Sequence, residues 1–180
     1  MHGSGSDNDG DRAWVFGYGS LIYKVDFPVL ERSAATLNGW KRRFWQASHD
    51  HRGTPDAPGR VVTLVPEPGA ACRGMAYRVD RDVFDHLDHR EKNGYGRHRV
   101  RLALDTGYEI DSLLYVAESD NPAWLGPAPV AAMADQIAGA RGPSGRNADY
   151  LLHLADALRD LDDHDPHVFE LEEAVRRVLA

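Results

Sequence analysis

The feature that most limits the fold is a change of pattern along the chain, from short apolar runs to helical periodicity. The early runs are rich in β-branched and aromatic residues and are separated by Gly, Pro and Asp clusters, which is typical of strands and turns. They predict strands at residues 14–18, 36–46, 60–65, 72–79, 98–104 and 112–117. The last third predicts helices at 131–140, 148–161 and 166–179. Strands first and helices last indicate an α+β fold rather than alternating βαβ units.

The two final helices show the clearest signals. In the helix predicted at 148–161, one face carries Leu151, Leu154, Leu158 and Leu161. In the second, Asp165 is placed to cap the helix and Pro166 to occupy its first position. Its expected inward stripe comprises Val168, Leu171, Val175 and Val178.

The length suits one compact domain. The chain has 180 residues, of which 42 % are hydrophobic and 27 % are charged, and this balance is ordinary for a globular protein. Residues 1–12 are polar and glycine-rich and bury too little apolar surface to offset the entropy of ordering. We therefore expect a flexible tail at 1–12 and a single domain at 13–180.

Charge and cysteine content exclude several classes of protein. The net charge of −7 disfavours a nucleic-acid partner, and the basic run at 41–43 is interpreted as part of an alternating strand with one solvated face. The single cysteine, Cys72, excludes an intramolecular disulfide and is expected to be inert core. No run approaches the roughly 20 apolar residues needed to cross a bilayer. The start of the chain does not resemble a signal peptide, so we expect a cytoplasmic protein without a membrane partner.

A short helix at 81–91 interrupts the strands. Its apolar positions are Val83, Phe84 and Leu87, and Glu91 falls on the same stripe, four residues after Leu87. Burial and the negative end of the helix dipole would both raise the pKa of the Glu91 carboxyl, which suits a general base near neutral pH. The alternative is that Glu91 pairs with a nearby arginine and has no catalytic role.

The first strand ends in two glycines two residues apart, Gly17 and Gly19. Glycine permits positive φ and a close backbone approach, and successive N–H groups in such a turn can form a nest for a carboxylate. From these residues alone, a strand end or bulge is the favoured explanation of the pair. The histidines around residue 50 could suggest a metal site, but the chain has no Cys/His array of the structural-zinc kind, so none is expected.

Six longer blocks of the sequence form a more specific pattern. In chain order they are Phe-Gly-Tyr-Gly-Ser-Leu-Ile at 16–22, Lys-Val-Asp-Phe-Pro at 24–28, the segment at 42–61 that contains Arg-Arg-Phe-Trp-Gln and His-Arg-Gly, Leu-Asp-His-Arg-Glu-Lys-Asn-Gly-Tyr at 87–95, Asp-Asn-Pro-Ala-Trp-Leu-Gly-Pro-Ala-Pro at 120–129, and Gly-Pro-Ser-Gly-Arg-Asn-Ala-Asp-Tyr-Leu at 142–151. Together they resemble the ChaC family of γ-glutamylcyclotransferases. The blocks occur in the family's order. The sequence departs from the family pattern at Tyr23, where Trp is usual, at Asn93, where Gly is common, and at Arg73, where an aromatic residue is usual.

The resemblance implies a small mixed β-barrel with flanking helices. It also implies a lyase that cleaves glutathione to 5-oxoproline and cysteinylglycine, with Glu91 as the general acid/base. The substrate would be bound by Val15, Phe16, Gly17, Tyr18, Gly19, Ser20 and Leu21. Arg52 and Tyr115 are further candidates for substrate binding, although each could equally serve packing or loop hydrogen bonds.

The reaction itself is an intramolecular aminolysis, in which the α-amine of the γ-glutamyl group attacks its own γ-carbonyl. No water enters, so we expect neither a cofactor nor a metal. A small-molecule substrate and a monomer or weak dimer are expected. Two alternatives remain open: a cyclotransferase for other γ-glutamyl amino acids or amines, and a non-catalytic binding module of the same fold.

Overall fold

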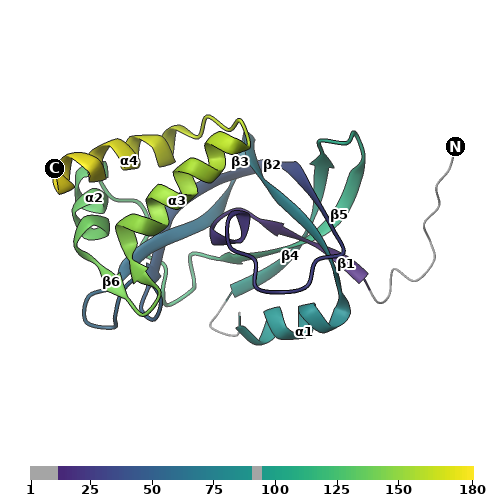
Figure 1. Cartoon of the computed structure of the whole chain (residues 1–180), viewed down its shortest axis with the longest axis horizontal. Coiled ribbons are helices and arrows are strands. Elements are labelled where there is room, and N and C mark those ends of the chain that lie inside the picture. Colours follow the sequence, from purple (N-terminus) through teal and green to yellow (C-terminus); the bar gives the residue numbers. More distant parts are fainter. Residues whose placement is uncertain (1–11, 91–94) are drawn as a thin grey trace, which may run out of the picture.

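Strands make up most of the first two thirds of the chain and helices the last third (Figure 1). The computed structural model describes residues 12–90 and 95–180. Its elements in chain order are β1 (Arg12–Gly17), the 3₁₀ turn η1 (Ser20–Ile22), β2 (Glu31–Ser48), β3 (Gly59–Asp80), α1 (Arg81–Arg90), β4 (Tyr95–Leu104), β5 (Glu109–Ala117), α2 (Val130–Gly139), β6 (Arg141–Gly142), β7 (Gly145–Arg146), α3 (Asn147–Asp160) and α4 (Pro166–Leu179). The α+β class predicted from the sequence is confirmed.

Five strands close into a barrel in the order β1-β3-β2-β4-β5. Neighbouring strands pair antiparallel except β1 and β5, which meet in parallel at Val15 and Leu113 and close the barrel. One buried apolar cluster contains Phe16, Leu37, Leu64, Cys72, Leu102 and Leu114 among others. Burial raises the pKa of the Cys72 thiol to about 11, so this side chain stays protonated at neutral pH. The expected small mixed barrel with flanking helices is therefore present.

Strands β2 and β3 are much longer than the sequence predicts, with 18 and 22 residues. The expected strands at 60–65 and 72–79 are one continuous strand, so their separation was wrong. The joining residues at 66–69 are exposed and carry no buried-face pattern that would mark them as a strand. The pairing shifts register near Gly39, whose φ of 86° favours glycine. Both strands extend from the barrel to form a ribbon under α2, α3 and α4 (Figure 1).

The three C-terminal helices pack on this ribbon through a second apolar cluster. The strands contribute Phe44 and Val62 to it, and the helices contribute Ile137, Leu151, Leu154, Leu158, Val168, Leu171 and Val175. The predicted cap of α4 is confirmed, because the Asp165 carboxylate accepts hydrogen bonds from the N–H groups of His167 and Val168 at 3.1 and 3.3 Å. Val178 was wrongly expected in the buried stripe. It is 49 % exposed, because the last turn of α4 lies at the edge of the molecule (Figure 1).

Helix α1 lies on the outside of the barrel. Its predicted apolar positions Val83, Phe84 and Leu87 are buried, and they belong to a third cluster with Val15 and Tyr77. This packing brings the end of α1 toward the residues that follow β1. Glu91 lies outside the described residues. Within residues 12–90 and 95–180, no helix combines the length and apolar character needed to span a membrane.

Candidate functional site

A cavity of about 450 Å³ lies where the end of β1 meets the β2–β3 ribbon and α1. Its volume falls in the range of roughly 300–1,000 Å³ that is typical of small-molecule sites. Eight residues predicted from the sequence to bind substrate line its wall, namely Val15, Phe16, Tyr18, Gly19, Ser20, Leu21, Arg52 and Tyr115. They come from β1, from η1 and the residues before it, from the loop after β2, and from β5. This cavity is the candidate functional site.

Two of the predicted site residues are not part of the described wall. Gly17 is buried at the end of β1 and does not line the cavity. Glu91 lies outside the described residues, but Leu87, four residues earlier on α1, is on the wall. The structure therefore places the helix that precedes Glu91 against the cavity.

Gly17, the last residue of β1, and Gly19 both occupy positions that leave no room for a side chain. A Cβ on Gly19 would lie 2.8 Å from a methyl group of Val62 and 2.9 Å from the Tyr150 hydroxyl, and a Cβ on Gly17 would lie 2.8 Å from the Cβ of Leu21. Gly19 has φ −129°, and Gly17 is not among the glycines with positive φ, so this pair does not use the positive φ that glycine permits. What the glycines provide is close approach of the backbone to its neighbours.

Tyr18 is held at both its side chain and its backbone. Its hydroxyl donates a hydrogen bond to the backbone carbonyl of Tyr115 at 2.6 Å. Its own carbonyl accepts a hydrogen bond from Arg42 Nε at 2.7 Å. One turn later, the carbonyl of Leu21 accepts a short hydrogen bond from the Tyr77 hydroxyl. The loop that lines the cavity is thus attached to β2, β3 and β5.

Arg52 lies in the loop between β2 and β3, which also borders the cavity. Its backbone N–H donates to the hydroxyl of Ser48 at 2.9 Å, and its Nη1 donates to the carbonyl of Arg146 at 3.2 Å. The guanidinium stands 5.8 Å from the centre of the Tyr150 ring, within the range of a cation–π contact. These contacts place a cationic group on the cavity wall while the β6–β7 hairpin supports it.

Charges of both signs surround the cavity. Lys24 and Arg52 are cationic, and Asp26 and Asp50 are anionic. A ligand end that carries a carboxylate beside an ammonium group would find a partner for each. The site therefore suits the α-amino-acid end of a small zwitterion better than a purely anionic or apolar ligand.

The comparisons with known proteins identify the family. The family model described as ChaC-like protein matches residues 13–178, which is most of the chain. The chain belongs to the ChaC family. Gamma-glutamylcyclotransferase 2-3 of Arabidopsis thaliana is 42 % identical over 179 residues, a match that covers 93 % of this chain and 90 % of that protein. Glutathione-specific gamma-glutamylcyclotransferase 1 of Homo sapiens is 38 % identical over 184 residues, covering 96 % of this chain and 83 % of the human protein.

A solved structure supports the same ChaC fold. The crystal structure of a gamma-glutamyl cyclotransferase specific to glutathione from yeast superimposes with a TM-score of 0.86 at 31 % sequence identity. The superposition covers 93 % of this chain and 96 % of the yeast chain. The barrel, the long ribbon and the C-terminal helices thus have a counterpart in a relative whose name states its activity.

Some wall residues of this ChaC site were not predicted from the sequence. Lys24, Asp26, Ser144 and Tyr150 lie in blocks that carry the family resemblance, yet nothing in those blocks shows which side chains point inward. Tyr150 packs its ring edge-on against Phe44, and its hydroxyl accepts a hydrogen bond from the backbone N–H of Val62 at 3.3 Å. Membership of a family-matching block was therefore the only sequence signal for these four residues, and the fold is needed to assign them to the cavity.

Tyr23, where the ChaC pattern usually has Trp, lies just behind the wall. Its ring packs edge-on against Tyr150 and His153. Its hydroxyl is buried and makes no hydrogen bond of normal geometry to any residue that the structure describes. Burial raises the pKa of Tyr23 to about 12, although the nearby Arg52 guanidinium acts in the opposite direction. Tyr23 is therefore a neutral phenol that supports the cavity from behind.

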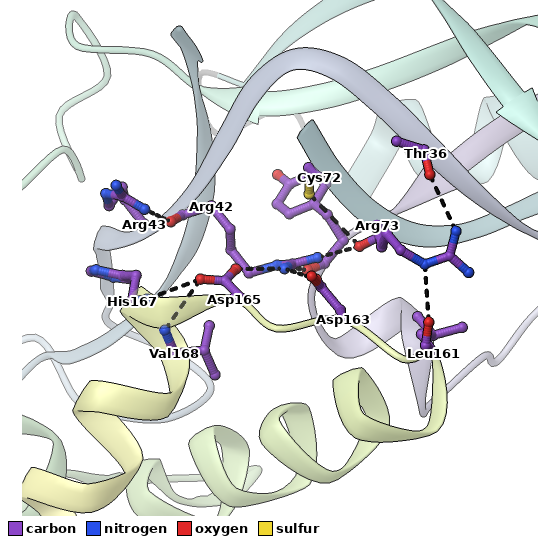
Figure 2. A network of polar contacts seen from close by, with 11 residues as sticks. Thr36, Arg42, Arg43, Cys72, Arg73, Leu161, Asp163, Asp165, His167 and Val168 are labelled. Carbon is purple, nitrogen blue, oxygen red and sulfur yellow. Dashed lines mark hydrogen bonds and ion pairs between the residues drawn. The ribbon is translucent and has the colours of Figure 1, made fainter. Parts of the chain in front are cut away.

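Arg73, the second described departure from the ChaC pattern, has a structural role away from the cavity. Its Nε donates to the carbonyl of Leu161 at 3.0 Å, and its two terminal nitrogens contact the Asp105 carboxylate at 2.9 and 2.8 Å. The side chain thereby joins β3 to the residue after α3 (Figure 2). Asn93, the third departure, lies outside the described residues.

The histidines near residue 50 are at the surface. His49 and His51 are exposed, and His51 Nδ1 lies 3.2 Å from the hydroxyl of Ser144. In the part of the chain that the structure describes, no three His, Cys, Asp or Glu side chains are grouped so that they could hold a metal ion.

Proposed function

We propose that this chain is a γ-glutamylcyclotransferase that converts glutathione to 5-oxoproline and cysteinylglycine. The observation that carries the proposal is the match to the ChaC-like family over residues 13–178, together with a cavity lined by the family-type glycine loop. Relatives from Homo sapiens and Schizosaccharomyces pombe, 38 % and 40 % identical, are named as glutathione-specific enzymes of this kind.

The reaction requires one bond to form and one to break. The α-amine nitrogen of the γ-glutamyl group attacks the γ-carbonyl carbon and closes a five-membered lactam. The amide bond from that carbon to the cysteine nitrogen then breaks. A proton leaves the attacking amine, and one is delivered to the departing nitrogen, so protons balance without water. The substrate supplies its own nucleophile, and the site must fold it so that the amine faces the carbonyl.

The cavity offers groups for both charges of the γ-glutamyl end. The backbone N–H groups of the loop at 17–21, with Arg52, would bind the α-carboxylate. Asp26 and Asp50 lie on the same wall and would attract the ammonium group. Tyr115 is buried on β5, its carbonyl fixes the Tyr18 hydroxyl, and its ring would border the folded substrate. Arg52 and Tyr115 are thus proposed as substrate contacts.

Glu91 is proposed as the general acid/base. In the sequence it comes one residue after the end of α1. Its helical spacing from Leu87, which lies on the cavity wall, predicts that it faces the cavity as well. A carboxylate reaching the cavity from there would accept the proton of the attacking amine and return one to the leaving nitrogen. No cofactor or metal is needed for this chemistry, because no external nucleophile has to be activated.

The expectations for location in the cell, oligomeric state and partners rest on the sequence alone. We propose a cytoplasmic enzyme that is a monomer or weak dimer and that has neither a nucleic-acid nor a membrane partner. Its net charge of −7 supports the absence of a nucleic-acid partner. Other γ-glutamyl amino acids or amines are the alternative substrates, since they differ only in the leaving group.

The test is a product assay with a matched pair of variants. Purified protein with EDTA is incubated with glutathione and, separately, with a panel of γ-glutamyl dipeptides and amines, and the products are measured by mass spectrometry. We expect equimolar 5-oxoproline and cysteinylglycine, and a kcat lower by roughly 10²- to 10⁴-fold in Glu91→Gln. Glu170→Gln changes an exposed carboxylate on α4 and should retain full turnover. Preference for another γ-glutamyl compound would change the substrate, whereas inactivity on the whole panel would leave a binding module.

A further inference from the structure

Arg42 is a charged side chain in the interior of the molecule. It is 2 % exposed and lies on β2 between the half-buried Lys41 and Arg43. The predicted alternation of this strand is correct, but Arg42 occupies its buried face with Phe44 rather than the solvated one. A buried guanidinium is tolerated only when it is paired and hydrogen-bonded. The hydrogen-bond and ion-pair partners of the Arg42 guanidinium therefore show which segments of the chain it joins.

The guanidinium makes four contacts with three other segments of the chain. Its Nε donates to the carbonyl of Tyr18 at 2.7 Å, and its Nη2 donates to the carbonyl of Arg73 at 2.5 Å. Its Nη1 donates to the carboxylates of Asp165 at 2.7 Å and Asp163 at 3.3 Å. Figure 2 shows both carboxylates, from the residues before α4, pointing at Arg42. One side chain thus joins the cavity loop, β3 and the start of α4.

The contact with Tyr18 acts on the peptide that leads into Gly19. In a trans peptide the C=O and the following N–H point in opposite directions. No cis peptide occurs in the described chain, so holding the Tyr18 carbonyl on Arg42 directs the Gly19 N–H away from Arg42. Tyr18 and Gly19 line the cavity, whereas Arg42 is not on its wall. The Tyr18 hydroxyl is fixed independently by Tyr115, so the residue has little freedom to turn.

We propose that Arg42 is a positioning residue that orients the Tyr18–Gly19 peptide toward the substrate. The Gly19 N–H then serves as a preorganised donor to the carboxylate or to the oxyanion that develops at the γ-carbonyl. This inference rests on the proposed cyclotransferase function. Arg42 acts through the loop and does not itself touch the reacting atoms.

A purely structural role predicts a different outcome on substitution. Replacing a buried ion network as a whole by uncharged groups is often neutral for stability, whereas removing one partner leaves charges buried and unpaired. The variant Arg42→Met/Asp163→Asn/Asp165→Asn removes the whole charge network, and asparagine remains a good helix cap at 165. It should unfold closer to the wild-type temperature than Arg42→Met does. It still lacks the donor to the Tyr18 carbonyl.

The experiment compares thermal unfolding and steady-state kinetics of the wild type with those of four variants, namely Arg42→Met, the triple variant, Arg42→Lys and a control. The substrate is glutathione, or whichever γ-glutamyl compound the wild type turns over. For the triple variant we expect kcat/KM to fall about 100-fold, with kcat reduced as well as KM raised, because a misplaced donor acts in the transition state. Arg42→Lys keeps the charge but not the planar fork, so it should fold and lose a similar factor. The control Arg101→Met removes an exposed arginine and should behave like the wild type.

The outcomes separate the two proposals. A folded triple variant and a folded Arg42→Lys with wild-type kcat/KM would overturn the positioning role and leave the cyclotransferase function intact. A loss of activity that follows only the loss of thermal stability across the set would also overturn it. A wild-type protein that is inactive on every γ-glutamyl substrate would overturn both proposals together.

Discussion

His167 gives a prediction for stability that can be worked out from its surroundings. It lies in the first turn of α4, and its Nε2 accepts a hydrogen bond from the backbone N–H of Phe44 at 2.9 Å. Burial, and to a smaller extent the nearby Arg43, lower its pKa to about 4, with Asp165 offsetting part of the effect. A protonated imidazole could not accept that hydrogen bond, so the folded protein holds His167 neutral.

The direction and the size of the pH effect on the unfolding free energy follow from the two pKa values of His167. In the unfolded chain histidine has a pKa of 6.5, against about 4 in the folded protein. Between these values the unfolded state binds a proton that the folded state does not, so the stability from this group is complete above pH 6.5 and is lost as the pH falls to about 4. A difference of about 2.5 pKa units at 1.36 kcal/mol each corresponds to about 3 kcal/mol.

The assay is urea unfolding of the wild type and of His167→Gln at pH 7.5 and pH 4.5. Glutamine retains an acceptor for the Phe44 N–H but does not titrate. Between these two pH values the wild type should lose about 2.5 kcal/mol more unfolding free energy than the variant does. His164→Gln replaces an imidazole whose side chain is 89 % exposed and serves as the control. Equal pH dependence in the wild type and His167→Gln would refute the reasoning.

Three further substitutions test the packing around the site. Asn147→Ala removes a buried amide that bonds both the N–H and the carbonyl of Arg60 at 2.8 Å, and should cost about 2–4 kcal/mol of unfolding free energy in urea. Leu154→Ala in the helical core should cost about 2–5 kcal/mol in the same assay, and a value below 1 kcal/mol would contradict the assigned packing. Gly142→Ala would place a Cβ 2.4 Å from a carbonyl oxygen of the loop that holds Arg52, so KM should rise about 10-fold. Gly139→Ala, where a Cβ meets nothing within 4 Å, should leave KM unchanged.

Patterns within a single helix correctly predicted the features that depend only on neighbouring residues. The cap formed by Asp165 and Pro166, the buried leucines of α3 and the apolar positions of α1 follow from spacing along a helix, and the structure confirms them. The joining of two predicted strands into β3 could not be predicted in the same way. Residues 66–69 are exposed, and of these only Pro66 pairs with β2, opposite Trp40. The register then shifts and pairing resumes at Ala71, so neither the local pattern nor regular pairing marks this stretch as strand.

The site itself depends on contacts between distant parts of the chain. The alternation of β2 places Arg42 and Phe44 on one face, but nothing in the local sequence shows that Asp163 and Asp165, more than 120 residues later, neutralise the charge. Tyr150 reaches the cavity for the same reason, through the packing of α3 on the β2–β3 ribbon. Blocks that match a family indicate which segments matter, whereas the fold determines which side chains meet.

The central claim is that the substrate's own amine, rather than water, attacks the γ-carbonyl. The most direct measurement is turnover of glutathione by the wild-type protein in water enriched in oxygen-18, with mass spectrometry of the products. We predict 5-oxoproline and cysteinylglycine in equal amounts, with no oxygen-18 incorporated into either. Glutamate carrying oxygen-18 in its γ-carboxylate would show hydrolysis instead and would contradict the account.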